Sequence, residues 1–158
     1  MEMLALQSQI NPHFMYNPLN SIRWLSELQG ADKVTQMIDA LVKVLNYVAE
    51  DTSEFVNVGR EVEFIRNYIK ILNFRYFERF SFIFDIREET MQYEIPRFIL
   101  QPLVENAVNH GIRGVEWQGE IHLKVQDKGE RIELRVEDNG KGMTREQVGM
   151  ILSGSHTT

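Results

Sequence analysis

A histidine between two prolines is the first feature of the sequence that could do chemistry. His13 lies in a stretch whose apolar residues recur at the spacing of one helix face. Gln9 and Asn17 stand four positions before and after it, so the three polar side chains share one side of such a helix. Pro12 and Pro18 would each cost about 3 kcal/mol inside a helix, which stability alone does not explain. We therefore interpret His13 as a reactive group and the prolines as residues that bend its helix.

A second group of polar residues lies within residues 101–110, in a helix predicted to run from Pro96 to about His110. Leucine, valine and alanine form its apolar side, while the other side carries Glu105, Asn106, Asn109 and His110. A carboxylate with amides one turn apart can hold a hydrated Mg²⁺, an ion that prefers oxygen ligands and keeps several waters. By spacing alone, a solvated helix face is the more economical interpretation.

The loop at residues 138–142, Asp-Asn-Gly-Lys-Gly, directly follows an alternating stretch that predicts a strand. Gly140 and Gly142 would let the backbone approach a ligand closely. Asp138 could accept a hydrogen bond from an exocyclic amine such as that of adenine. Taken alone, the loop fits an ordinary turn equally well.

Composition limits the classes of protein to which the chain can belong. It has 158 residues, of which 43% are apolar and 25% charged, as in a globular protein of one or two domains. The absence of cysteine excludes disulfides and thiolate metal sites. A net charge of −6 without a basic cluster argues against a nucleic-acid partner. With no signal peptide, and no run near the roughly 18 apolar residues of a membrane span, we expect a cytoplasmic location. Because the chain begins inside an apparent helix, we also expect it to be a fragment of a longer protein.

Two helices should form a hairpin that carries His13. They are predicted at residues 6–28 and about 33–49, with Gly30 ending the first and Asp32 as N-cap of the second. The second helix has a coiled-coil spacing of apolar residues at Val34, Ile38, Leu41, Leu45 and Val48. Each helix has more apolar surface than the other can cover. We therefore predict a homodimer with a four-helix bundle, the alternative being packing on the C-terminal half of the same chain.

The rest of the chain predicts an α+β sandwich with helices on one face of the sheet. Residues 50–59 are polar and lack periodicity, and we interpret them as a linker. The predicted elements that follow are a helix at 60–77, a strand at 80–86, a helix from Pro96 to His110 ended by Gly111, strands at 119–126 and 131–137 joined in a hairpin, and a short helix capped by Thr144 and running toward Leu152.

Three of these stretches, together and in order, resemble the sensor histidine kinases of the LytS/YesM type. Residues 6–22 are similar to the phosphoacceptor box of that family, with His13 at the phosphorylated position. LQPLVENAVNHGI at residues 100–112 resembles its N box, and VEDNGKGM at residues 136–143 its first glycine box. Residues 95–102 also match, so the resemblance covers nearly the whole chain.

The resemblance implies two domains. Residues 1–52 would form the dimerisation and histidine phosphotransfer hairpin, and residues 58–158 an ATP-binding domain of the gyrase, Hsp90 and histidine-kinase superfamily. The implied activity is ATP-dependent phosphorylation of His13, followed by transfer to an aspartate on the receiver domain of a response regulator. Membrane contact would come only through a segment upstream of this chain.

The resemblance also assigns roles to individual residues, with ATP and Mg²⁺ as cofactors. Asn106 would bind Mg²⁺, Glu105 would act as base or hold a water, Asn109 and His110 would belong to the nucleotide site, Asp138 would read adenine, Gly140 and Gly142 would keep the loop close to the nucleotide, and Asn17 would assist dephosphorylation of the partner. An imidazole is largely neutral at pH 7 and can therefore attack a γ-phosphoryl group.

Three departures from the family pattern leave alternatives open. Phe14 stands where many histidine kinases have an acidic residue, so the base must come from the other domain or from water. Asn109 stands where the family usually has lysine, and the chain stops at Thr158, before the second glycine box and the lid. These two departures favour a dimer scaffold or phosphotransfer module that docks a response regulator without binding ATP. A free ATPase of the gyrase or Hsp90 type ranks last, since it would not need a histidine on a hairpin.

Overall fold

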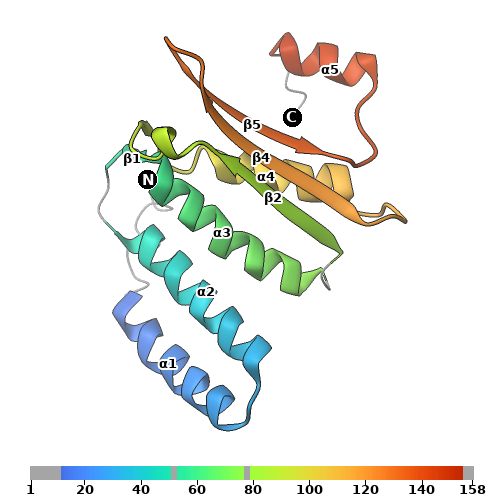
Figure 1. Ribbon diagram of the computed structural model, residues 1–158. Coiled ribbons are helices and arrows are strands. Elements are labelled where there is room, and N and C mark those ends of the chain that lie inside the picture. Colours follow the sequence, from blue (N-terminus) through green and yellow to red (C-terminus); the bar gives the residue numbers. More distant parts are fainter. Residues whose placement is uncertain (1–11, 51–52, 77–78, 155–158) are drawn as a thin grey trace, which may run out of the picture. The chain divides into compact units, whose positions relative to one another are not determined.

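The computed structural model describes residues 12–50, 53–76 and 79–154, with residues 12 and 13 described by their backbone only (Figure 1). The described residues fall into two compact units, one within residues 1–78 and 89–100 and the other within 79–88 and 101–158. Among these described residues, no helix combines the length and the apolar character needed to cross a membrane. The predicted division into residues 1–52 and 58–158 stays a prediction.

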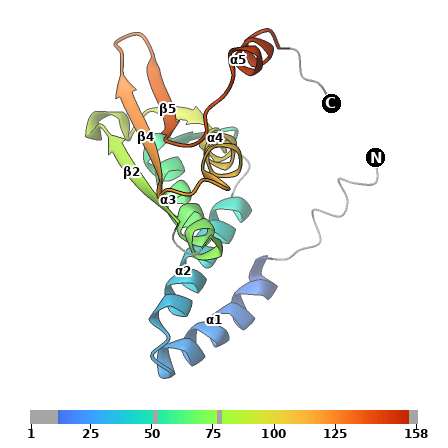
Figure 2. The same ribbon diagram turned by 90° about the vertical axis from the view of Figure 1, so that its right-hand side faces the viewer.

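The first unit opens with the predicted helical hairpin. Helix α1 (Pro12–Leu28) and helix α2 (Asp32–Ala49) lie side by side, as both views show (Figures 1 and 2). Gly30 has a positive φ of 65° in the turn, which confirms its predicted role at the end of α1. Asp32 as N-cap was wrong: the cap position is Ala31, and Asp32 is the first residue of the helix. There its negative charge still lies favourably near the positive end of the helix dipole.

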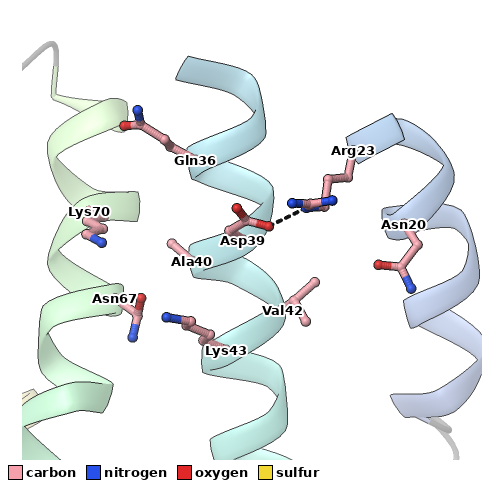
Figure 3. Close-up of a pocket in the computed structure, with 9 residues that line it drawn as sticks. All are labelled: Asn20, Arg23, Gln36, Asp39, Ala40, Val42, Lys43, Asn67 and Lys70. Atoms are coloured by element: carbon pink, nitrogen blue, oxygen red, sulfur yellow. Dashed lines mark hydrogen bonds and ion pairs between the residues drawn. The ribbon is translucent and has the colours of Figure 1, made fainter. Parts of the chain in front are cut away.

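Helix α3 (Val58–Arg75) packs on α2, so α2 lies between two helices. A polar groove of about 520 Å³ is lined by residues of α1, α2 and α3 (Figure 3). In this groove the Nε atom of Arg23 donates a hydrogen bond to Oδ1 of Asp39 at 2.6 Å and so joins α1 to α2. Another Arg23 nitrogen lies 3.0 Å from Glu27. One side of α1 is thus held against α2 by charge as well as by packing.

The opposite side of α1 is apolar and uncovered. Phe14 is 79% exposed, Leu25 58% and Leu28 75%. Of the predicted coiled-coil positions on α2, Ile38 is buried but Val34 and Val48 are exposed. The hairpin therefore leaves apolar surface that its own two helices do not bury.

The first unit also contains a two-stranded sheet, one strand of which comes before α3 in the sequence and the other after it. Strand β1 (Phe55–Asn57) pairs antiparallel with strand β3 (Glu94–Pro96). The linker prediction was therefore wrong for these residues, because a strand this short shows no periodicity. Pro96 closes β3 and does not start a helix, which corrects a second prediction. Proline is tolerated in such an edge strand because its missing N–H is not needed there.

The second unit contains the predicted strands in one mixed sheet. Its order is β2 (Phe80–Ile86), β4 (Gly119–Asp127) and β5 (Ile132–Asp138), with β2 parallel and β5 antiparallel to the central β4. Alternate residues of β4 form the core of the unit: Ile121, Leu123 and Val125 are all fully buried. The alternation that predicted these strands therefore reflects one packed face of the sheet.

Two helical segments complete this unit. Helix α4 (Leu100–Asn106), which belongs to this unit from residue 101 onward, continues as a π-helix (Ala107–Ile112) that contacts β4 and β5. Helix α5 (Arg145–Leu152) begins with the predicted cap, where Thr144 and Gln147 form a reciprocal capping box. The class is α+β, as predicted: a helical hairpin followed by helices and mixed sheet.

Candidate functional site

A cavity of about 720 Å³ lies in the second unit. Its walls come from α4 and the π-helix, from the end of β5 with the following loop, and from α5. The lining residues are Leu103, Asn106, Ala107, His110, Gly111, Val136, Asp138, Lys141, Gly142, Met143, Gln147, Met150 and Ile151. This is the size and mixed character of a small-molecule site, with apolar walls and a few polar groups.

Four residues predicted from two separate motifs meet in this cavity: Asn106 and His110 from the helix, and Asp138 and Gly142 from the loop. Gly140 is not among the lining residues. Its backbone N–H donates a hydrogen bond to Oδ1 of Asp138 at 2.9 Å, within the same loop. Glu105 is not among the lining residues. Its Oε1 accepts a hydrogen bond from Nε2 of Gln101 at 3.0 Å.

Asn109 also falls outside the lining, on an exposed part of the π-helix. Lys141 of the glycine loop, by contrast, is among the lining residues. From the sequence, Lys141 was considered only as part of the glycine loop, without a role of its own. Its position directly between the two loop glycines was the available signal.

Close packing between the loop and the π-helix explains why glycine occupies two positions. A Cβ atom on Gly140 would lie 2.2 Å from the backbone of Gly111, and one on Gly111 would lie 2.3 Å from Oδ1 of Asp138. The backbone N–H of Lys141 also donates to the carbonyl of Gly111 at 3.2 Å. Gly111 was predicted to end the helix, which is wrong, because the helical segment continues to Ile112. Its role is close approach of two backbones.

Replacing Gly140 by alanine should therefore destabilise the second unit. The added methyl group overlaps backbone atoms that cannot rotate away, and such overpacking costs about 1–3 kcal/mol. Gly149 is the matched control, since a Cβ there meets nothing within 4 Å in the interior of α5. Gly149→Ala should leave stability unchanged or raise it by up to about 1 kcal/mol. Urea unfolding measures both, and equal stability of the two variants would contradict this packing.

The loop is fixed on its other side by Asn139. The Oδ1 atom of Asn139 accepts a hydrogen bond from the backbone N–H of Glu120 at 2.7 Å. Its carbonyl accepts one from the indole N–H of Trp117 at 3.0 Å. Asn139 thus ties the loop to the start of β4, and neither it nor Trp117 was predicted as a site residue. Asp138 is consequently held at the cavity by hydrogen bonds of the two residues that follow it in the chain, Asn139 and Gly140.

The phosphoacceptor candidates lie on α1 in the first unit. His13 is in the first turn of that helix, and its side chain lies outside the described residues. Asn17 is exposed one turn later, and its carbonyl accepts a hydrogen bond from Oγ of Ser21 at 3.0 Å. Pro18 lies inside the continuous helix, as predicted.

The cavity fits a substrate-bound Mg²⁺ better than an ion held by protein alone. Within the described part of the chain, no three histidine or acidic side chains gather as a metal site. Asn106 lines the cavity, and its amide oxygen could supply one hard ligand there. An ion that keeps several waters and binds phosphate oxygens needs no more than one or two protein ligands.

Comparison with known protein families gives separate matches for the part of the chain that contains His13 and for the part that contains the cavity. The histidine kinase family model matches residues 1–80, and the model of histidine kinase-, DNA gyrase B- and HSP90-like ATPases matches residues 92–158. The second match contains the whole cavity.

Named relatives agree with the family models. The chain is 35% identical to sensor histidine kinase YesM of Bacillus subtilis strain 168 and 38% to sensor histidine kinase YpdA of Escherichia coli K12, over 90% of this chain in both cases. It is 28% identical to sensor protein LytS of Staphylococcus saprophyticus over 95% of the chain. The chain spans about a quarter of the length of each of these relatives, 25% in all three. The resemblance to the LytS/YesM type is confirmed, and the chain belongs to the histidine kinase family.

Proposed function

We propose that this chain is the core of a two-component sensor histidine kinase, working in the cytoplasm where ATP is available. It would phosphorylate itself on His13 with ATP and pass the phosphoryl group to an aspartate on the receiver domain of a response regulator. One observation carries the proposal: Asn106, His110, Asp138 and Gly142, which belong to two motifs, line one cavity of about 720 Å³.

The polar groups of the cavity suit the parts of ATP. The carboxylate of Asp138 can accept a hydrogen bond from the adenine amine. Gly142 leaves backbone accessible, and Lys141 supplies positive charge toward the phosphates. Asn106 would hold Mg²⁺, whose charge offsets that of the phosphates when it is bound. Phosphoryl transfer needs mainly positioning and charge neutralisation, and these residues provide both.

In the proposed transfer, a ring nitrogen of His13 forms a bond to the γ-phosphorus. The bond between that phosphorus and the bridging oxygen breaks, and ADP leaves with the electron pair. The other ring nitrogen then loses its proton to a base. No acidic residue follows His13 directly, since the next residue is Phe14. We propose Glu105 or water as that base, and Asn17 as the residue that assists dephosphorylation of the partner.

A calorimetric titration with ATP and Mg²⁺ tests the nucleotide site. Binding heat that disappears in the presence of excess ADP is expected, together with weaker binding after chelation of Mg²⁺. The second candidate is a scaffold that docks a response regulator without binding ATP. The observation in its favour is Asn109, which stands outside the lining of the cavity. No binding heat in the full-length protein would favour the scaffold.

We also propose that a second copy of the chain covers the apolar side of α1 and completes a four-helix bundle. Phe14, Leu25 and Leu28 lie on that side and are mostly exposed in the single chain. Burial of such side chains stabilises by about 1.5–3 kcal/mol each, which is enough to hold two hairpins together when several are buried.

Placing a charge on this surface should therefore separate the dimer. Leu25→Glu would bury an unpaired carboxylate in the bundle, and we expect the dimer dissociation constant to rise by about 100-fold or more. Asn20→Glu is the matched control, because it adds the same charge to the same helix at a polar position lining the groove beside α2. Sedimentation equilibrium measures both variants. A dimer that tolerates Leu25→Glu as well as Asn20→Glu would exclude this side of α1 as the interface.

A further inference from the structure

Glu61 on α3 is a fully buried carboxylate, with 0% of its surface exposed. Burying an ionised carboxylate is costly unless hydrogen-bond donors surround it. Glu61 has three such donors: the hydroxyl of Tyr47 at 2.5 Å, the backbone N–H of Phe98 at 3.2 Å and that of Leu100 at 3.3 Å. Tyr47 belongs to the last turns of α2, whereas Leu100 is the first residue of α4. One buried side chain therefore joins the end of the hairpin to the start of α4.

The Tyr47 side chain is fixed for this contact. Its ring stacks on Phe64 with centroids 4.4 Å apart and meets the edge of Phe98 at 5.4 Å. Burial, and then the hydrogen bond to Glu61, raise the pKa of Tyr47 above its ordinary value. The hydroxyl therefore stays protonated and able to donate throughout the physiological pH range.

Arg97 also joins the end of α2 to the residues that precede α4. Its guanidinium lies 4.6 Å from the centroid of the Tyr47 ring and 5.0 Å from that of Phe98. It donates hydrogen bonds to the backbone carbonyls of Tyr47 and Glu50, the latter at 3.1 Å, where α2 ends. These carbonyls have no partner within the helix, because they lie at its C-terminal end.

Phe98 adopts a backbone conformation that a bulky residue rarely takes. Its φ is +61°, and Phe98 is the only residue other than glycine with a positive φ in the described part of the chain. Such a residue stays in place only where its surroundings hold it. Here Glu61 binds its N–H, and the rings of Tyr47 and Phe64 contact its side chain. If these contacts were lost, residues 97–99 would relax, and α4 would begin differently.

We infer that Glu61 is a positioning residue that ties the end of α2 to the start of α4, so that the hairpin sets the nucleotide affinity of the cavity. Asn106 stands six residues after Leu100 in the same helix, and it lines the cavity. A shift of the α2 end that draws Tyr47 away from Glu61 would release the start of α4 and disturb Asn106. This inference rests on the proposed nucleotide function of the cavity, and it gives that function a means of regulation. Coupling of this kind is reciprocal, so bound nucleotide should in turn strengthen the Tyr47–Glu61 contact.

The test is a set of dissociation constants for a non-hydrolysable ATP analogue with Mg²⁺. They are measured on wild type, Tyr47→Phe, Glu61→Gln and the double variant, at a temperature where circular dichroism shows all four to be folded. Tyr47→Phe removes only the hydroxyl and keeps the stacked ring. We therefore expect this variant to fold even if the Glu61→Gln variant does not fold. We expect each single variant to weaken binding about fivefold or more, and the double variant no more than the larger single effect. Glu63→Gln is the matched control, an exposed carboxylate on the same helix that pairs with Lys43 at 3.7 Å.

Amide hydrogen exchange with and without nucleotide distinguishes a positioning role of Glu61 from a purely structural one. Nucleotide should slow exchange of the Phe98 and Leu100 amides in wild type, and this slowing should be lost in Tyr47→Phe. A wild type that binds no nucleotide would reject the proposed function, and this inference with it. Equal affinities in wild type and Tyr47→Phe would overturn the inference alone. Effects of the two substitutions that simply add would also overturn it, since they would then act independently.

Discussion

Replacing His13 by alanine is expected to reduce transfer of phosphate from ATP to the full-length protein to background. The imidazole is the proposed nucleophile, and alanine leaves nothing at that position to form a bond to phosphorus. The measurement is acid-labile label on the protein after incubation with Mg²⁺ and γ-labelled ATP. Label at the wild-type level in His13→Ala would reject the assignment of His13.

His122 offers a matched control for this substitution. It lies on β4, where its Nε2 is 2.6 Å from Oε1 of Glu120, and it does not line the cavity. His122→Ala should keep its label, because its contacts are local to the sheet. Equal loss of label in both variants would mean that removal of any histidine harms the protein, and the result for His13 would then carry no chemical meaning.

Replacing Asp138 by alanine should weaken ATP binding by about 10- to 100-fold. A hydrogen bond to a charged group contributes about 1.5–3 kcal/mol, and the proposed partner is the adenine amine. GTP has no amine at that ring position, so its weaker binding should change less. The variant should therefore lose most of the preference for ATP over GTP, as measured by calorimetry with each nucleotide.

Glu137→Ala is the control for Asp138→Ala. Glu137 is the neighbouring exposed carboxylate, and it pairs with Lys124 and Arg135 on the sheet, each at 3.5 Å. Glu137→Ala removes the same charge as Asp138→Ala, but from a neighbouring residue that does not line the cavity. If both variants weakened ATP and GTP to the same extent, Asp138 would act through net charge and not by recognition of adenine.

Regular patterns made much of the fold predictable from the sequence. The helices of the hairpin, the alternating strands of the second unit and the Thr144 cap each depend on residues close together in the chain. Periodicity reports such local structure directly, because it reflects which face of an element is buried. The hydrophobic alternation of residues 119–126, for example, corresponds to the buried positions of β4.

The errors arose where a residue's role depends on a distant partner. Pro96 carries the same local signal at the start of a helix as at the end of an edge strand, and only pairing of β3 with β1 decides between them. Gly111 likewise looks like a helix end, whereas its contact with Gly140 lies far along the chain. Asp32 was predicted as the N-cap but is the first residue of its helix. This difference of one position is within the usual uncertainty of a helix boundary.

Only part of the site was predicted, because some of its residues depend on partners that are distant in the sequence. Asn106, His110, Asp138 and Gly142 carry recognisable motifs, and they line one cavity. The apolar walls from α5, such as Ile151, have no such signal. Glu61 could not have been found by pattern, because a glutamate on a helix is ordinarily solvated, and its burial follows from donors supplied by Tyr47 and Phe98.

The most direct test of the central claim is to map the phosphate on the protein after reaction with ATP. The full-length protein is incubated with Mg²⁺ and ATP, digested at alkaline pH to preserve phosphohistidine, and analysed by mass spectrometry. We predict phosphate on the peptide that contains His13, at that residue, and none when a nucleotide analogue occupies the cavity. Phosphate on another residue, or hydrolysis of ATP with no phosphorylated peptide, would contradict it.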